Sequence, residues 1–173
     1  MTWTAPAIER VDPPHVSDER TSLEAWLNYH RQTLLWKSSG LTGEQLTERP
    51  IGSSTLSLLG LVRHMGEVER WWFRRNFGGE PIGDLFCTPE YPDGDFDLTD
   101  AGNSEADFAA FTAECEAADR AAGGHGLDET FVHPRRGNEI DLRWVYVHMI
   151  EEYARHNGHA DLIRELVDGT TGD

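Results

Sequence analysis

The most regular hydrophobic pattern of the chain lies near its C-terminal end, between residues 144 and 166. This segment contains no proline, and at about 100° per residue its apolar side chains fall in one broad sector. Such a sector is typical of the buried face of an amphipathic helix. The pattern therefore predicts a long final helix, with Asp141 as its N-terminal cap and these apolar residues facing inward: Trp144, Val145, Met149, Leu162, Ile163 and Leu166.

Four polar residues fall in that same sector: His148, Glu152, His156 and His159. An unpaired carboxylate or imidazole in a protein core is costly, so such groups must be paired, hydrogen-bonded or bound to a metal. Glu152 and His156 are four residues apart and therefore lie on adjacent turns, where one small cation could bridge them. We therefore expect the functional site on this helix.

Three earlier segments also show helical periodicity. We expect helices at about residues 18–38, 54–77 and 104–122, with a short capped turn formed by Thr42 and Gln45 between the first two. Long connections follow the second and third helices. The prediction is an all-α fold, a four-helix bundle, and bundles of this kind commonly carry metal sites between facing helices.

The chain is expected to form one domain over residues 18–168. Residues 1–17 contain three prolines and no period, and we interpret them as an extended arm that Trp3 packs on the domain. Residues 169–173 form a C-terminal tail. We expect residues 78–103, which are acidic and rich in glycine and proline, to be irregular and less ordered than the helices.

Within this loop, Asp93, Asp95 and Asp97 resemble the start of a calcium loop. The match fails because Leu98 stands where glycine is needed and Ser104 where a bidentate glutamate is expected. We interpret the segment as a solvated turn.

Two histidines lie on the apolar faces of the earlier helices. His64, in the second helix, shares a face with apolar residues, and with Glu152 and His156 it makes a set of two histidines and one glutamate, as in catalytic zinc sites. His159 or His148 could replace Glu152, and His148 is better placed to orient a ligand. His30, in the first helix, is interpreted as a hydrogen-bonded core residue, with a pocket-lining role as the alternative.

A metal-free alternative also fits this spacing. Glu152 could pair with an imidazolium or with an arginine, either Arg155 or Arg63, in a buried polar network. Arg135 and Arg136 are interpreted as a surface pair, with substrate recognition as the alternative.

Composition narrows the class of partner. The formal net charge of −16 argues against nucleic acid or an anionic membrane as the main partner. Cys87 and Cys115 are too few for a disulfide scaffold, and no signal sequence or membrane-spanning run is apparent, so the expected location is cytoplasmic. Many Trp and Tyr residues in a small bundle favour a homodimer.

Two stretches carry a family resemblance. "LSLLGLVRHMGEVERWWF" and, some 80 residues later, "VYVHMIEEYARHNGHADLIRE" resemble the DinB-like superfamily, in particular its actinobacterial branch related to mycothiol-dependent maleylpyruvate isomerase. The resemblance covers residues 20–168. It implies a four-helix bundle whose divalent metal is held by His64, Glu152 and His156. Glu152 stands where many relatives have histidine, which is similar to the His-Glu-His variant of the isomerase branch.

The resemblance also implies an activity. Such proteins transfer a low-molecular-weight thiol such as mycothiol, or use it to assist an isomerisation of a small electrophile. Zinc is the first choice of metal, with nickel, iron or manganese as alternatives, and His148, His159 or His30 are candidates for moving protons. The competing hypotheses are a metal-dependent hydrolase and a non-catalytic, stress-related metal-binding bundle.

Overall fold

The computed structural model describes residues 2–172, and most of them are helical. In chain order the elements are α1 (Glu19–Ser38), α2 (Gly43–Leu46), α3 (Leu58–Glu69), the π-helix η1 (Arg70–Phe77), α4 (Gly94–Asp97), the 3₁₀-helix η2 (Ala101–Asn103), α5 (Ser104–Ala122), β1 (Thr130–Val132), β2 (Glu139–Asp141) and α6 (Leu142–Asp168). The predicted all-α bundle is confirmed.

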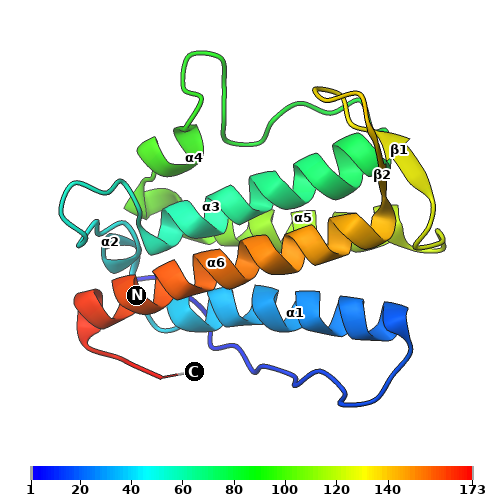
Figure 1. Cartoon of the computed structure of the whole chain (residues 1–173). Helices are drawn as coiled ribbons and strands as arrows, with labels where there is room; N and C mark the ends of the chain where they lie inside the picture. Colours follow the sequence, from blue (N-terminus) through cyan, green and yellow to red (C-terminus); the bar gives the residue numbers. More distant parts are fainter. Residues whose placement is uncertain (1, 173) are drawn as a thin grey trace.

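The four long helices form two parallel pairs (Figure 1). α1 and α6 run in the same direction, because Arg143 reaches Glu19 near their starts and Arg164 reaches the Ser39 carbonyl near their ends. α3 and α5 form the second pair, which runs the opposite way. The long connection from residue 78 to residue 103 returns the chain to the end at which α3 began, so that α5 can run alongside it.

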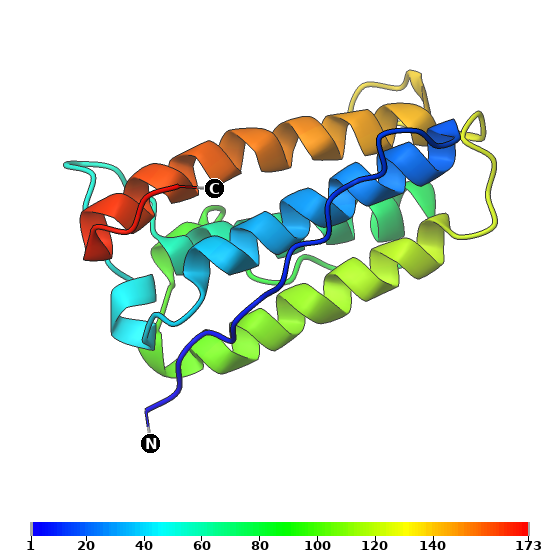
Figure 2. The same cartoon turned by 90° about the horizontal axis from the view of Figure 1, so that it is seen from below.

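The N-terminal arm lies along the bundle (Figure 2). The Ala5 amide donates a 2.9 Å hydrogen bond to the Leu41 carbonyl, and Thr4 forms a bridge with Thr42. The Trp3 ring lies 5.4 Å from that of Phe108 on α5, edge to face. Trp3 therefore packs the arm on the domain, as the sequence indicates.

Local signals located several helix ends correctly. Asp141 caps α6 by accepting from the Trp144 amide at 2.7 Å, and Thr42 and Gln45 form the predicted capping box of α2. The predicted start of the second helix at about residue 54 was wrong: α3 begins at Leu58 and Ser57 is its cap. Ser54 is engaged in a local turn, in which its hydroxyl accepts from the Leu56 amide at 3.3 Å.

Two other segments differ from expectation. The final turns of the second predicted helix form η1 and are π-helical, a geometry that hydrophobic periodicity does not distinguish from α. The connection after α5 contains a hairpin, β1–β2, in which Phe131 pairs with Ile140. Residues 78–103 are irregular, as predicted, apart from α4 and η2.

The buried face of α6 is rotated from the predicted one. Val145, Met149 and Ile163 are buried, but Trp144, Leu162 and Leu166 are 41%, 57% and 58% exposed, so the prediction was wrong for these three. The buried stripe is centred on Tyr153 and Ala160, because α6 packs against α1 on one side and α3 on the other. The polar residues of the predicted sector consequently lie at the edge of the buried face.

A buried charge network ties the bundle together. The Arg31 guanidinium on α1 donates two 2.7 Å bonds to the carboxylate of Glu69, which is fully buried at the end of α3. The Tyr153 hydroxyl on α6 donates to the same carboxylate at 2.8 Å, and Arg31 also reaches Asp119 on α5 at 2.8 Å. Glu69 thus joins three helices, and Arg31 extends the network to the fourth.

None of the helices in residues 2–172 is long and apolar enough to cross a membrane. The homodimer stays a prediction.

We expect Glu69→Gln to destabilise the fold by about 3–5 kcal/mol, because it leaves a buried guanidinium without its main counter-charge. Glu116→Gln is the matched control, since Glu116 pairs with Arg120 at 3.9 Å with both side chains about 70% exposed; it should cost less than about 0.5 kcal/mol. Urea unfolding measures both. Equal, small losses would show that the buried pair is not needed.

Candidate functional site

His64 and His156 meet where α3 packs against α6. Their rings lie 4.8 Å apart, edge to face. The two histidines are 92 positions apart in the sequence, and the bundle brings them into contact because each lies at the rim of its helix's buried face. The side chain of His64 is 25% exposed and that of His156 is 12% exposed.

Glu152 lies one turn before His156, with its Oε2 atom 3.6 Å from His156 Nε2. This separation is long for a hydrogen bond. It is close to the ~3.3 Å that separates two ligands of a tetrahedral ion when each metal–ligand bond is about 2.0–2.1 Å. Among the described residues the Glu152 carboxylate has no hydrogen-bond partner within 3.5 Å. The arrangement thus places His64 beside His156, and His156 beside Glu152. The ligand atoms of these three residues do not all lie within 4.8 Å of one another, whereas those of His148, Glu151 and Glu152 do.

The His156 ring is held neutral. Burial, reinforced by the neighbouring rings of His64 and His159, lowers the pKa of His156 to about 4. A neutral imidazole keeps a lone pair on one ring nitrogen, as a metal ligand must. His156 is therefore ready to coordinate at pH 7 without losing a proton.

The alternative ligands also lie close by. The His148 ring stacks on Trp144 at 4.8 Å, and its Nε2 atom lies 3.7 Å from Glu152 Oε1. His148, Glu151 and Glu152 present ligand atoms within 4.8 Å of one another, although the Glu151 side chain is half exposed and bonded to Arg155. Burial lowers the pKa of His148, so this ring too is a neutral neighbour of the site.

The two remaining candidate histidines differ in position. The Nδ1 atom of His159 lies 3.4 Å from that of His156, so His159 adjoins the cluster from the next turn of α6. His30 lies between α1 and α6, where the Asn157 amide donates to its carbonyl at 3.0 Å. The His30 side chain is half-buried, with its Nδ1 atom 3.4 Å from the Asn157 amide nitrogen, and its role stays a prediction.

Of the two arginines suggested as partners of Glu152 in a metal-free network, only Arg155 lies close to its carboxylate. Arg155 approaches Glu152 at 3.6 Å. Arg63 cannot serve, because its buried guanidinium pairs with Asp107 at 2.9 Å and donates to two carbonyls of α4. That suggestion was wrong, since Arg63 points to α5 and α4 and away from the His156 side of α3.

Asp95 is a residue of the site that sequence reasoning missed. Its Oδ2 atom lies 2.7 Å from His64 Nδ1, and the residue is only 4% exposed. The interpretation of this segment as a solvated turn was therefore wrong for Asp95, although Asp93 and Asp97 are exposed. The calcium pattern marks the acidic run, but no local signal pairs Asp95 with a histidine 31 residues earlier.

A cavity of about 580 Å³ opens beside His64. It runs between the α3–η1 helix and the loop that carries α4, and its lining includes Trp71, Trp72, Cys87, Asp93, Phe96 and Arg135. Trp72 also contacts the His148 ring at 4.8 Å, so one wall of the cavity packs against the cluster on α6, although His148, Glu152 and His156 do not line the cavity themselves. Aromatic walls with a few polar groups are typical of small-molecule sites.

Two residues of the cavity lining, Cys87 and Arg135, affect which reactions and ligands the cavity can support. Burial raises the pKa of Cys87 to about 11, so this thiol stays protonated at neutral pH and is a poor nucleophile. Arg135 is exposed, but its guanidinium lies 5.7 Å from the Trp71 ring at the cavity. Arg135 can therefore meet a ligand, which fits the substrate-recognition alternative better than a plain surface role.

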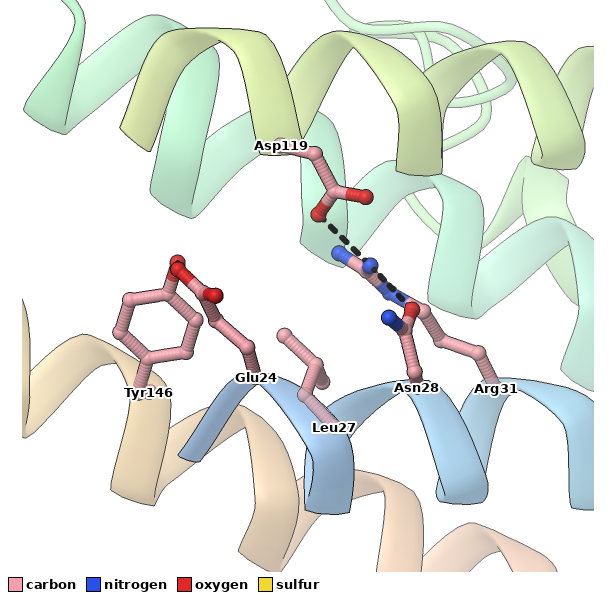
Figure 3. Close-up of a pocket in the computed structure, with 6 residues that line it drawn as sticks. All are labelled: Glu24, Leu27, Asn28, Arg31, Asp119 and Tyr146. Carbon is pink, nitrogen blue, oxygen red and sulfur yellow. Dashed lines mark hydrogen bonds and ion pairs between the residues drawn. The ribbon is translucent and has the colours of Figure 1, made fainter. Parts of the chain in front are cut away.

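Figure 3 shows a smaller pocket of about 220 Å³ on another part of the bundle. Its polar side chains bond with one another: Arg31 reaches Asp119 and Asn28, and Tyr146 donates to Glu24. These groups are satisfied, so the pocket carries no argument for a ligand. The chemistry of the molecule therefore centres on His64.

The lowered pKa of His156 predicts a pH dependence of stability in metal-free protein. An unfolded histidine titrates near 6.5, whereas the folded ring titrates near 4. Between these values only the unfolded state binds the proton, so the free energy of unfolding should fall by about 2–3 kcal/mol as pH drops from 6.5 to 4. Above pH 6.5 the ring has no effect.

His156→Gln is the control for this measurement, because it removes the titrating group. Chemical unfolding of wild type and variant between pH 7.5 and 4 gives both slopes. Identical slopes would contradict the assignment of a buried neutral ring at this position.

The comparisons with known proteins now bear on this site. A search of curated proteins found no match. The family model described as mycothiol-S-transferase matches residues 22–169, which is nearly the whole helical domain and contains every residue of the His64 cluster. The resemblance to the DinB-like superfamily is thereby confirmed. On this match, the chain belongs to the mycothiol S-transferase family.

Proposed function

We propose that this protein is a metal-dependent thiol transferase that joins a low-molecular-weight thiol such as mycothiol to a small electrophile, or uses the thiol to assist an isomerisation. The observation that carries the proposal is the contact between His64 and His156 beside a cavity of about 580 Å³. The choice of a thiol as co-substrate rests on membership of the mycothiol S-transferase family.

The predicted ligands His64, Glu152 and His156 suit a divalent cation in chemical type, and binding one would have to draw their side chains closer together than they lie in the structure. His64 has one ring nitrogen engaged by Asp95 and the other uncommitted, and His156 is neutral. The Glu152 carboxylate lies 3.6 Å from both His156 and Arg155 and accepts no shorter bond among the described residues. Two imidazoles and one carboxylate suit zinc and leave a further position open for substrate. Nickel, iron and manganese accept similar ligands, so zinc is the first metal to test.

When bound, such a cation would supply charge that favours the thiolate form of a thiol and polarises a carbonyl. A free thiol has a pKa of roughly 8.5 and is mostly protonated at neutral pH. The reaction forms a bond between sulfur and an electrophilic carbon while the leaving group departs with its electron pair. The thiol proton passes to the leaving group or to solvent.

The chain's own residues supply the surroundings of that reaction. Trp71, Trp72 and Phe96 line the cavity and exclude water from an apolar electrophile. His148 and His159 adjoin the cluster, and a neutral imidazole at either position can accept a proton. Arg135 offers a positive charge at the cavity to an anionic group of the substrate.

Two other functions use some of the same residues. A metal-dependent hydrolase would need the same ligands but no thiol, and a non-catalytic metal-binding bundle would need no substrate. The aromatic cavity beside the cluster favours a substrate over a purely structural ion.

We expect chelation to lower the melting temperature of wild-type protein by about 5–10 °C, because a ligand that binds only the folded state stabilises it. His156→Ala should bind no metal and should melt alike with and without chelator. Glu152→Gln should bind metal more weakly while keeping its shape.

His15→Ala serves as the control, because His15 is exposed and outside the cluster; it should respond to chelator as wild type does. Metal content is measured alongside each melt. If wild type carries no metal, ignores chelator, and loses several kcal/mol in the Glu152→Gln variant, the metal-free network is correct instead.

We expect zinc-loaded protein to consume small electrophiles only when a thiol is present, with mycothiol the preferred thiol. His64→Ala should lower the rate by at least about 100-fold, since metal charge stabilisation supplies several kcal/mol. Mass spectrometry of products identifies the thioether or the isomer. Turnover that needs no thiol would indicate a hydrolase, and metal-loaded protein inert to the whole panel would indicate a non-catalytic bundle.

A further inference from the structure

We propose that Asp95 is a positioning residue that fixes the tautomer and orientation of His64, so that the Nε2 atom of that ring is the one presented to a ligand. This deepens the proposed function, because it states how one member of the His64, Glu152 and His156 set is prepared for a cation. The inference rests on contacts made by α4, the one-turn helix that carries Asp95.

Both oxygens of the Asp95 carboxylate have partners. Oδ2 lies 2.7 Å from His64 Nδ1, and Oδ1 accepts from the Phe96 amide at 3.0 Å. An ionised carboxylate only accepts, so Nδ1 carries the hydrogen, and in the neutral ring the lone pair is then on Nε2. The Phe96 ring lies 4.9 Å from the His64 ring and restricts its rotation.

The backbone around Asp95 is held independently of its side chain. The Arg63 guanidinium donates to the carbonyl of Asp95 at 3.0 Å and to that of Gly94 at 2.9 Å, while pairing with Asp107 at 2.9 Å. Arg49 adds a bond to the Phe96 carbonyl at 2.6 Å. Arg63 therefore holds the main chain of α4 in place. His64, the next residue along α3, contacts the side chain of Asp95.

The fit of α4 leaves little freedom. A Cβ atom at Gly94 would lie 2.5 Å from the Phe86 carbonyl oxygen, so the turn is closely packed on the loop before it. Glu67, one turn further along α3, accepts from the Leu85 amide at 2.7 Å. The loop is thus attached to α3 at two points, through Arg63 and His64 and through Glu67, and the Asp95 carboxylate is in place before any ligand arrives.

The chemical consequence follows from the hydrogen bond. A carboxylate on one nitrogen of a ligating histidine fixes the ring and makes the other nitrogen a stronger donor, and its loss typically weakens metal affinity about 10–100-fold. Without Asp95 the His64 ring would sample both tautomers and more orientations. Asp95 would therefore set the affinity of the site for a cation through the His64 ring.

The test compares Asp95→Ala and Asp95→Asn with a matched control. Asp97→Asn changes the same charge on the same helix, at an exposed position that does not line the cavity. The first readout is the ¹⁵N spectrum of His64 in metal-free protein. It should report an Nδ1–H tautomer in wild type and Asp97→Asn, and a mixture or the Nε2–H tautomer in Asp95→Ala.

The second readout is zinc affinity, measured by competition with a chromophoric chelator. We expect a loss of about 10–100-fold in Asp95→Ala and about 10-fold in Asp95→Asn, with no change in Asp97→Asn. Asp95→Asn keeps the shape of the side chain, so it carries the test if the alanine variant does not fold. Wild-type tautomer in Asp95→Ala, or wild-type affinity in Asp95→Asn, would overturn the proposal.

The two readouts keep the hypotheses apart. Wild-type protein that binds no metal would refute the proposed function, while the tautomer measurement would still decide what Asp95 does to His64. Metal binding that is insensitive to Asp95 would refute the positioning role and leave the proposed function standing.

Discussion

The buried carboxylate of Glu69 is the interaction on which the rest of the bundle depends. It lies at the junction of α3 and η1, where it accepts from Arg31 of α1 and from Tyr153 of α6. Isolated charges in a core are strongly unfavourable, so this geometry is satisfied only when the helices stand in one relative position. That position fixes how far α3 is offset along α6, and hence places His64 beside His156.

The same constraint explains why the candidate site lies at the rim of the buried faces of α3 and α6. The polar residues of α6 that the sequence places among apolar ones are neither fully buried nor free in solvent, since Glu152 and His156 are 18% and 12% exposed. A site at this depth keeps imidazoles neutral and yet remains open to the cavity beside α3. A fully buried set would need a counter-charge, as Glu69 does.

Periodicity and capping signals predicted most of the fold, because they depend on neighbours within a few residues. The bounds of α5, the Asp141 cap and the contact between His64 and the α6 cluster all follow from local patterns and the bundle they imply. Asp95 could not be found this way, since its partner lies in another element and the loop has no period. The exposure of Trp144 depends on how α6 rotates against two neighbours, and a single-helix pattern does not contain that information.

The attachment of the 78–103 loop to α3 also bears on how the molecule opens. Arg63, His64 and Glu67 each bond to this loop, through carbonyls, a carboxylate and backbone amides. Segments joined in this way tend to separate as one cooperative unit with the element that holds them. The loop that forms one wall of the cavity should thus resist proteases about as well as the bundle does, instead of moving as a separate lid.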